Sequence, residues 1–344
     1  MRSIALMNQK GGVGKTTTTV NLAAAAARLG KRTLLVDLDP QAHATLHLGA
    51  DPAALDGSVY DLLLDPDHDP THPIISTREN LALIPAETDL AAAETELQNA
   101  PERQHRLKRA LDRLSHRFDL VLLDCPPALG LLTLNGLAAA TEVLIPMQAH
   151  FLALQGVSKL LETVQLVRGS LNDRLAVAGV VLCMHDHQTT LSQEVVADLT
   201  EFFDTARGTD VPWNAATIFD PPIRRNIKLA ECPSFGQTIF EYAPEAAGAK
   251  DYEALARSVL GITERTPAPA PLPQPETTSE PESTREAEPE PPVVNVVPQQ
   301  PIHTPTPQPH QQHQHQPSHH NGFPAAPPSF NPYPGPANTP DHPA

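Results

Sequence analysis

Residues 3–39 contain a short apolar segment, a glycine-rich turn, an alanine-rich segment and a second apolar segment, in that order. SIALMN (3–8) predicts a strand, and TTTTVNLAAAAARLG (16–30) predicts a helix that ends at Gly30. RTLLVDLD (32–39) has few polar residues before its acidic end, which is typical of strands covered on both faces of a parallel sheet. A strand, a helix and a second strand in succession predict a βαβ unit with a right-handed crossover.

The same alternation of strands and helices continues along the chain. Further strands are predicted at 119–124, 142–147, 175–184 and 215–219. RQHRLKRALDRLSHR (103–117) predicts a helix whose buried face is formed by Leu107, Ala110, Leu111 and Leu114. This pattern predicts an α/β fold with a doubly wound, mostly parallel sheet and helices on both faces. We therefore expect ligands at the carboxyl ends of the strands.

The composition of the chain changes near Thr263. Residues 265–344 hold 23 of the 38 prolines and 7 of the 16 histidines, and they contain almost no aliphatic run besides VVNVV (293–297). Such a segment cannot bury enough apolar surface to offset the entropy of the chain. We predict one folded domain at 1–262 and a disordered tail at 263–344 that is rich in proline, histidine, glutamine and glutamate.

The formal net charge of −16 opposes nucleic-acid binding by the surface as a whole. Residues 265–344 hold seven acidic and two basic side chains, so most of the negative charge belongs to the folded part. Any contact with DNA must therefore use a local basic patch.

The cysteines and the apolar segments of the sequence indicate in which cellular compartment the protein is expected. The three cysteines are widely separated and lack metal-ligand spacing, which favours a reduced, cytoplasmic compartment. The first ten residues predict a strand rather than a signal peptide. No segment has the roughly eighteen continuous apolar residues that a membrane span requires. We expect a soluble protein without a membrane partner.

The sequence KGGVGKT (10–16) joins the first predicted strand to the first predicted helix. Glycines let backbone N–H groups surround phosphates, and the helix N-terminus adds positive potential. The loop offers a close backbone approach, a phosphate cation and a hydroxyl for Mg²⁺ through Gly12, Gly14, Lys15 and Thr16. The strict G-x-x-x-x-G-K-[ST] pattern fails because Gln9 replaces its first glycine, and an additional lysine, Lys10, opens the loop.

Two predicted strands that end in aspartates accompany this loop. LVDLDPQ carries Asp37 and Asp39, and LVLLDCPP carries Asp124. An aspartate that closes an apolar strand beside a phosphate loop is placed to hold a metal-bound water. The three segments together predict a nucleotide site.

Longer segments extend this pattern to a family. They are NQKGGVGKTTTTVNLAAAAARLGKRTLLVDLDPQ, FDLVLLDCPPALGLLTLNGLAAA, VLIPMQ followed by ALQGVSKLLETV, TTLSQEV, and RRNIKLAECPSFGQTIFEYAPEAAGAKDYEALA. With them the chain resembles the ParA/Soj branch of the ParA–MinD ATPases, which carry a deviant Walker A phosphate loop and partition plasmids and chromosomes. The resemblance runs from Ile4 to about Leu260, and the tail has no counterpart.

The resemblance implies a site for ATP and Mg²⁺. ATP would be bound by Lys10, Gly11, Gly12, Val13, Gly14, Lys15, Thr16, Thr17 and Asn226. Lys15 would neutralise charge on the β- and γ-phosphates, and Thr17 would reach the α-phosphate. Mg²⁺ would be held by Thr16 directly and by Asp124 through water. Asp37 would either assist the metal site or support its loop.

The resemblance also implies two catalytic roles besides that of Lys15. Lys10 would cross to the nucleotide of a partner subunit, so that ATP closes a homodimer that ADP cannot hold. Asp39 would orient the attacking water, although a carboxylate after a strand can also serve as a helix cap or a turn residue.

The implied function is that of a Mg²⁺-dependent ATPase that acts as a nucleotide switch in chromosome or plasmid partitioning. A ParB-like partner would stimulate it, and it would bind DNA without sequence preference and be nucleoid-associated in its ATP-bound form. The candidate DNA contacts are Arg224, Arg225 and Lys228. Alternatively, Arg225 and Asn226 serve the nucleotide base or the core while Arg224 is solvated.

The chain departs from the family in DHQTTLSQEV (186–195), where Gln188 and Gln193 replace two arginines and the preceding His185 replaces a tyrosine. The loss of two cations weakens phosphate binding. One alternative places DNA contacts on the arginine stripe of 103–117, although such a stripe is more often the solvated face of a helix that covers a sheet. Another is a ParA-like positioner of a protein cargo, or a regulatory ATPase with weak DNA binding.

Three related classes fit less well. MinD-type proteins hold membrane through a C-terminal amphipathic helix, which a proline-rich end cannot form. Nitrogenase-type reductases need a second cluster cysteine in a glycine context, and the related tyrosine kinases need a terminal tyrosine cluster. Both features are missing here. The tail is either a solvated extension or a docking segment with VVNVV as its apolar anchor.

Overall fold

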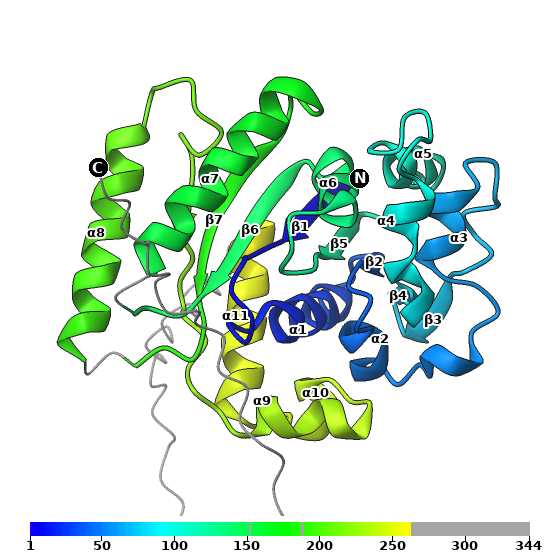
Figure 1. Ribbon diagram of the computed structural model, residues 1–344. Coiled ribbons are helices and arrows are strands. Elements are labelled where there is room, and N and C mark those ends of the chain that lie inside the picture. Colours follow the sequence, from blue (N-terminus) through cyan, green and yellow to red (C-terminus); the bar gives the residue numbers. More distant parts are fainter. Residues whose placement is uncertain (151–152, 187–188, 263–344) are drawn as a thin grey trace, which may run out of the picture. The chain divides into compact units, whose positions relative to one another are not determined.

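The computed structural model describes residues 1–150, 153–186 and 189–262, so the predicted disordered tail at 263–344 lies outside the described residues. An eight-stranded sheet runs through this part in the order β3-β4-β2-β5-β1-β6-β7-β8 (Figure 1). All neighbouring strands are parallel except β3 and β4. The strands are β1 Arg2–Leu6, β2 Thr33–Asp37, β3 Ile75–Arg78, β4 Leu81–Ile84, β5 Leu120–Asp124, β6 Glu142–Met147, β7 Ala176–Leu182 and β8 Thr217–Ile218.

Helices connect the strands and cover both faces of the sheet. The longer ones are α1 Lys15–Arg28, α5 Arg106–Arg113, α6 Leu131–Ala139, α7 Ala153–Ser170, α8 Thr190–Ala206 and α11 Ala247–Leu260. The shorter ones are α2 His43–His47, α3 Val59–Leu64, α4 Ala93–Glu96, α9 Lys228–Glu231 and α10 Ile239–Tyr242. Single 3₁₀ turns occur at η1 Pro52–Ala54, η2 Thr88–Ala91 and η3 Cys232–Phe235.

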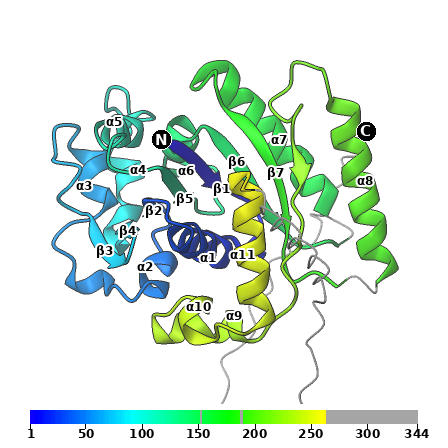
Figure 2. The ribbon, with the colours of Figure 1, turned by 180° about the vertical axis from the view of Figure 1, so that it is seen from behind.

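The core has two layers because every residue of β2 and β5 is buried, whichever face it points to. One layer contains the side chains of α1 and α11, including the fully buried Tyr252. The other contains side chains of α3 and of α5 to α8. Burial on both faces explains why these strands are apolar runs rather than alternating patterns. Figures 1 and 2 agree that α8 lies at one end of the sheet and α3 at the other.

The topology brings the acidic strand ends next to the loop that precedes α1. β1 lies between β5 and β6, and its last residue, Leu6, is paired with Asp124. In the next pair of strands Asp37 is opposite Asp124. Since the carboxyl ends of parallel strands meet at one edge, both aspartates lie at the base of the loop, as expected for an open α/β sheet.

The predicted fold class is confirmed: the sheet is mostly parallel and has helices on both faces. The antiparallel edge strand β3 and its neighbour β4 were not foreseen. The helix predicted at 103–117 is shorter: it begins at Arg106, after a turn in which Glu102 has a left-handed φ of 53°, and it ends at Arg113. Within the described residues no helix combines the length and the apolar character that a bilayer crossing requires.

Candidate functional site

The loop between β1 and α1 turns through two glycines in left-handed conformations. Gly12 has φ 72° and Gly14 has φ 96°. Any side chain at these positions would be strained. Gly14 is also the N-cap of α1 and has no capping side chain. The free N–H groups of the first helical turn therefore face the loop, which is the arrangement that binds phosphate.

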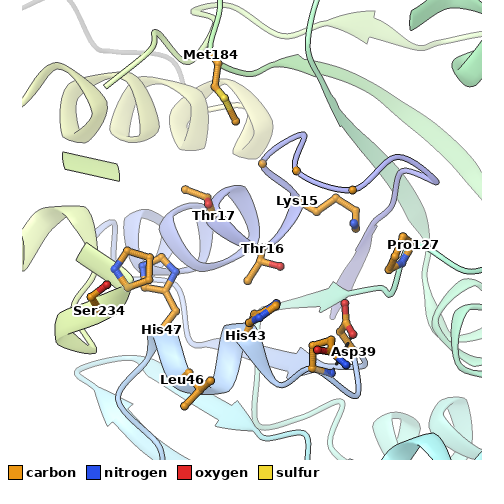
Figure 3. Close-up of a pocket in the computed structure, with 15 residues that line it drawn as sticks. Lys15, Thr16, Thr17, Asp39, His43, Leu46, His47, Pro127, Met184 and Ser234 are labelled. Carbon is orange, nitrogen blue, oxygen red and sulfur yellow. Dashed lines mark hydrogen bonds between the residues drawn. The ribbon is translucent and has the colours of Figure 1, made fainter. Parts of the chain in front are cut away.

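A cavity of about 660 Å³ opens in front of this loop. Figure 3 shows Lys15 reaching from the loop toward the side of the cavity that Asp39 and Pro127 line. Thr16 and Thr17 also line it, with α2 on the opposite wall. The cavity thus brings the lysine, the two hydroxyls and the Asp39 carboxylate around one space.

Asp124 sits beneath the loop and is held by hydroxyls of α1. Thr16 Oγ1 donates to Asp124 Oδ2 at 2.7 Å, and Thr19 Oγ1 lies 2.7 Å from Asp124 Oδ1. The carboxyl is 1% exposed. Burial raises its pKa, whereas the hydroxyls and the Lys15 ammonium oppose that rise. A carboxylate and a hydroxyl are oxygen ligands of the kind that Mg²⁺ prefers, so the residues present fit that ion.

Asp37 is fully buried on the strand next to that of Asp124, and its carboxylate accepts hydrogen bonds from the segment that follows β2. Its Oδ2 accepts hydrogen bonds from Thr45 N and Thr45 Oγ1, both at 2.9 Å. Its Oδ1 accepts from Asp39 N at 3.1 Å. Burial and the charge of Asp124 both raise the pKa of this carboxyl. Of the two roles expected for Asp37, the geometry favours support of the loop over binding of the metal.

Asp39 begins a tight turn after β2. Its Oδ1 accepts from Gln41 N at 3.0 Å, so the side chain does serve as a turn carboxylate. Its half-buried carboxylate also lines the cavity. The turn therefore fixes the direction of the carboxylate without removing it from the site, and the two interpretations of Asp39 are compatible.

Lys10 is exposed, and it is not among the residues that line the cavity. Its Nζ lies 2.6 Å from His150 Nε2. An ammonium group has no lone pair, so Lys10 donates and His150 accepts. Gly11 lines the cavity, and the side chain of Val13 is buried. Within one subunit Lys10 thus lies outside the lining of the cavity to which Lys15 belongs.

A second cavity of about 330 Å³ adjoins the first, since Gly14, Thr17 and Met184 line both. Asn226 lines its wall together with apolar side chains, including Ile223, Ile227 and Leu229. An apolar slot with a few polar groups suits a flat heterocycle attached to phosphates. Asn226, which the resemblance implies as an ATP contact, is thus part of the wall of this adjoining cavity.

The three predicted DNA contacts differ in their surroundings. The Arg224 guanidinium forms an ion pair with Asp251 at 2.7 Å, and the Asp251 side chain is only 5% exposed. Lys228 pairs with Glu231 at 2.8 Å. Arg225 is exposed and, within the described part of the chain, has no ion pair or side-chain hydrogen bond. Of the three predicted DNA contacts, Arg225 is therefore the one whose charge is not neutralised by an ion pair within the described residues.

The alternative basic surface, the arginine stripe of 103–117, is exposed at Arg109, Arg113 and Arg117. Arg106 is buried and donates to the backbone oxygens of Leu64 and Pro101. In the segment that departs from the family, His185 Nδ1 lies 3.2 Å from Ser192 Oγ. Gln193 is exposed on α8, and Gln188 lies outside the described residues.

The supporting residues that sequence reasoning missed include Thr19, His150 and Asp251. Thr19 could have been found, since residues three apart on a helix share a face and Thr16 and Thr19 both reach Asp124. His150 and Asp251 carry no such signal. Their partners, Lys10 and Arg224, are respectively 140 and 27 residues away in the chain.

Comparisons with known proteins agree with this geometry. A family model described as an AAA domain matches residues 1–177. The sporulation initiation inhibitor protein Soj of Bacillus subtilis is 46% identical over 258 residues, which are 74% of this chain and 97% of that protein. The chromosome-partitioning ATPase Soj of Thermus thermophilus is 48% identical and covers 76% of this chain and 96% of its own length.

Solved structures give the same result for the fold. The chain is similar to the structure of cobyrinic acid a,c-diamide synthase from Mycobacterium smegmatis with bound ATP analogue and magnesium, at 38% identity and a TM-score of 0.63. That match covers 76% of this chain and 94% of the other. The name of that protein denotes a different reaction, whereas relatives of higher identity include chromosome-partitioning ATPases named Soj. The predicted resemblance is confirmed, and the chain belongs to the ParA/Soj family of chromosome-partitioning ATPases.

Proposed function

We propose that this chain is an ATP-driven switch in chromosome or plasmid partitioning. It binds ATP with Mg²⁺ in the cavity before α1, closes into a homodimer on ATP, and reopens after hydrolysis. The observation that carries this proposal is the placement of the two loop lysines. Lys15 lines the cavity, while Lys10 is exposed outside it. Two lysines on one loop that face different spaces fit a nucleotide bound between two copies.

In this proposal the residues of the chain act mainly by position and charge, as is usual in phosphoryl transfer. Lys15 and the N–H groups of the loop bind the β- and γ-phosphates, and Thr17 reaches the α-phosphate. Thr16 and, through water, Asp124 hold Mg²⁺, which offsets phosphate charge when bound. The carboxylate of Asp39 orients the attacking water. Asn226 contacts the base in the adjoining cavity.

The proposed homodimer forms when Lys10 leaves His150 and contacts the phosphates of the opposite copy. A triphosphate carries enough charge to bind a lysine from each side, whereas a diphosphate lacks the γ-phosphate that the second lysine needs. Dimerisation thereby reports which nucleotide is bound. The folded ATPase domain comprises 1–262, and deletion of 265–344 leaves ATP-dependent dimerisation intact. A truncated protein that fails to dimerise contradicts this boundary.

DNA binding without sequence preference and stimulation by a ParB-like partner complete the proposal, and they place the ATP-bound form on the nucleoid. Arg225 is the strongest candidate contact because its charge is unpaired within the described residues. A second candidate function, the positioning of a protein cargo with weak DNA binding, is favoured by the ion pairs of Arg224 and Lys228 and by the acidic net charge.

The ATPase rate of the full chain, measured with and without DNA over a range of salt concentrations, separates the two functions. The partitioning switch predicts stimulation by DNA that disappears as salt rises. Asp39→Ala is the control for contaminating activity and should bind ATP without turnover. An ATPase rate that is the same with and without DNA, even at low salt, contradicts the DNA-based switch and supports the cargo positioner.

A further inference from the structure

A second surface of the molecule combines an aromatic groove with unpaired acidic side chains. The groove has a volume of about 530 Å³ and lies between the C-terminal half of α8 and residues 209–213. Phe202 and Trp213 stack in it, with ring centroids 6.3 Å apart and planes 20° apart. Phe202 is 37% exposed. A large aromatic ring left in water on a groove wall is typical of a site that a partner covers.

The charges around this groove have one sign. The sequence of α8, TLSQEVVADLTEFFDTA, contains no lysine or arginine. Glu194, Asp198 and Glu201 recur at helical spacing and so share a face. Asp198 and Glu201 line the groove, and neither has an ion pair or a side-chain hydrogen bond within the described part of the chain. The nearby arginines, Arg168 and Arg207, are neutralised by Asp210 and Asp204.

These features fit a ligand that is both cationic and apolar. The stacked rings offer apolar surface and, for a guanidinium or ammonium group, a cation–π contact. The two carboxylates offer partners to lysine or arginine at the rim. The tail of this chain is a poor occupant because residues 265–344 hold seven acidic and two basic side chains. The groove would repel it.

We propose that the groove of α8 and residues 209–213 binds a basic peptide segment of a partner protein, with one aliphatic or aromatic side chain of that segment inserted against Phe202 and Trp213. The groove lies at the β8 end of the sheet, where α8 follows β7. It shares no lining residue with the nucleotide cavity. Occupation of the groove is therefore measurable without nucleotide, and it does not depend on the proposed switch.

Trp213 makes the test direct, because it is the single tryptophan of the chain. A synthetic capped peptide that interleaves lysine and arginine with leucine is titrated into the full-length protein, and tryptophan emission is followed. We expect a saturable change in emission that weakens as salt rises. Two control peptides, one with glutamate in place of the basic residues and one with glycine in place of leucine, should give little change.

A pair of matched variants locates the binding. Asp198→Asn combined with Glu201→Gln removes the two carboxylates without changing size, and it should weaken the lysine–leucine peptide about fivefold to tenfold, the range expected for two exposed ion pairs. Asp67→Asn combined with Glu79→Gln removes the same charge from exposed positions that follow α3 and β3 in the chain, and it should leave the affinity unchanged. Circular dichroism checks that both variants are folded.

Four results would overturn the proposal. The first is an emission that does not change in the wild type, and the second is equal affinity in the two double variants. The third is a saturable change with a peptide of residues 290–299, which would make the tail the occupant. The fourth is a change that follows protein concentration alone, which would make a second copy the occupant.

Discussion

Replacement of Thr45 by valine tests what holds the acidic loop of the site. Thr45 is fully buried, and its hydroxyl has two partners. It donates to Asp37 Oδ2 at 2.9 Å and accepts from Ala86 N at 3.0 Å. Valine has nearly the same shape but can do neither. The substitution therefore removes one of the three hydrogen bonds of the Asp37 carboxyl and leaves the Ala86 N–H without a partner.

The expected cost follows from these two losses. A hydrogen bond to a charged group contributes about 1.5–3 kcal/mol, and a buried N–H left unpaired costs about 1–3 kcal/mol. The free energy of unfolding should fall by about 4 kcal/mol, which lowers the melting temperature of a domain of this size by about 10 °C. Because Asp37 also binds Asp39 N, ATP turnover should fall more than ATP affinity.

The assay is urea unfolding of the protein without nucleotide, together with steady-state ATPase kinetics. Thr45→Ser is the matched control, since it keeps the hydroxyl and loses one methyl group, at a cost of about 1 kcal/mol. If Thr45→Val cost no more than Thr45→Ser, the hydroxyl would not support Asp37, and the reasoning would be refuted.

Three further predictions concern other parts of the structure. Lys15→Ala should abolish ATP binding, which calorimetry measures, and retained affinity would contradict the role of the buried lysine. Arg225→Ala should weaken DNA binding and reduce the salt slope by about 1, whereas Arg224→Ala should mainly reduce thermal stability because the buried Asp251 carboxylate loses its ion pair. Equal DNA effects of the two variants would refute this distinction. Burial lowers the pKa of His47 to about 4, so its neutral form contributes stability above about pH 6.5 that is lost as pH falls toward 4. Between pH 7 and pH 5 the wild type should therefore lose about 2 kcal/mol more stability than His47→Gln in urea unfolding, and parallel losses would contradict that.

The sequence predicts those parts of the fold and the site that depend on residues close together in the chain. Apolar runs predict β5 and β6 because buried parallel strands have no polar face, and the loop of 10–16 predicts its own turn because glycine allows left-handed φ. The aspartates at strand ends meet because parallel strands place their carboxyl ends together. Edge strand β3 was missed because ISTR is short and only partly buried.

The rest depends on contacts between distant segments. Arg224 looks like a free cation in the sequence, but the fold brings it against the buried Asp251 on α11. Lys10 looks equally free, but His150 accepts its hydrogen bond. The aromatic groove arises because a separate segment places Trp213 beside Phe202 of α8. The sequence pattern within one segment does not show which residues of a distant segment its side chains will contact.

The mass of the Asp39→Ala protein in solution, measured by light scattering in ATP and Mg²⁺ and again in ADP and Mg²⁺, tests the central claim most directly. A nucleotide shared between two copies predicts a dimer in ATP and a monomer in ADP, and the additional substitution Lys10→Ala should restore the monomer while ATP stays bound. A protein that is saturated with ATP and Mg²⁺ yet remains monomeric with Lys10 intact would contradict the account.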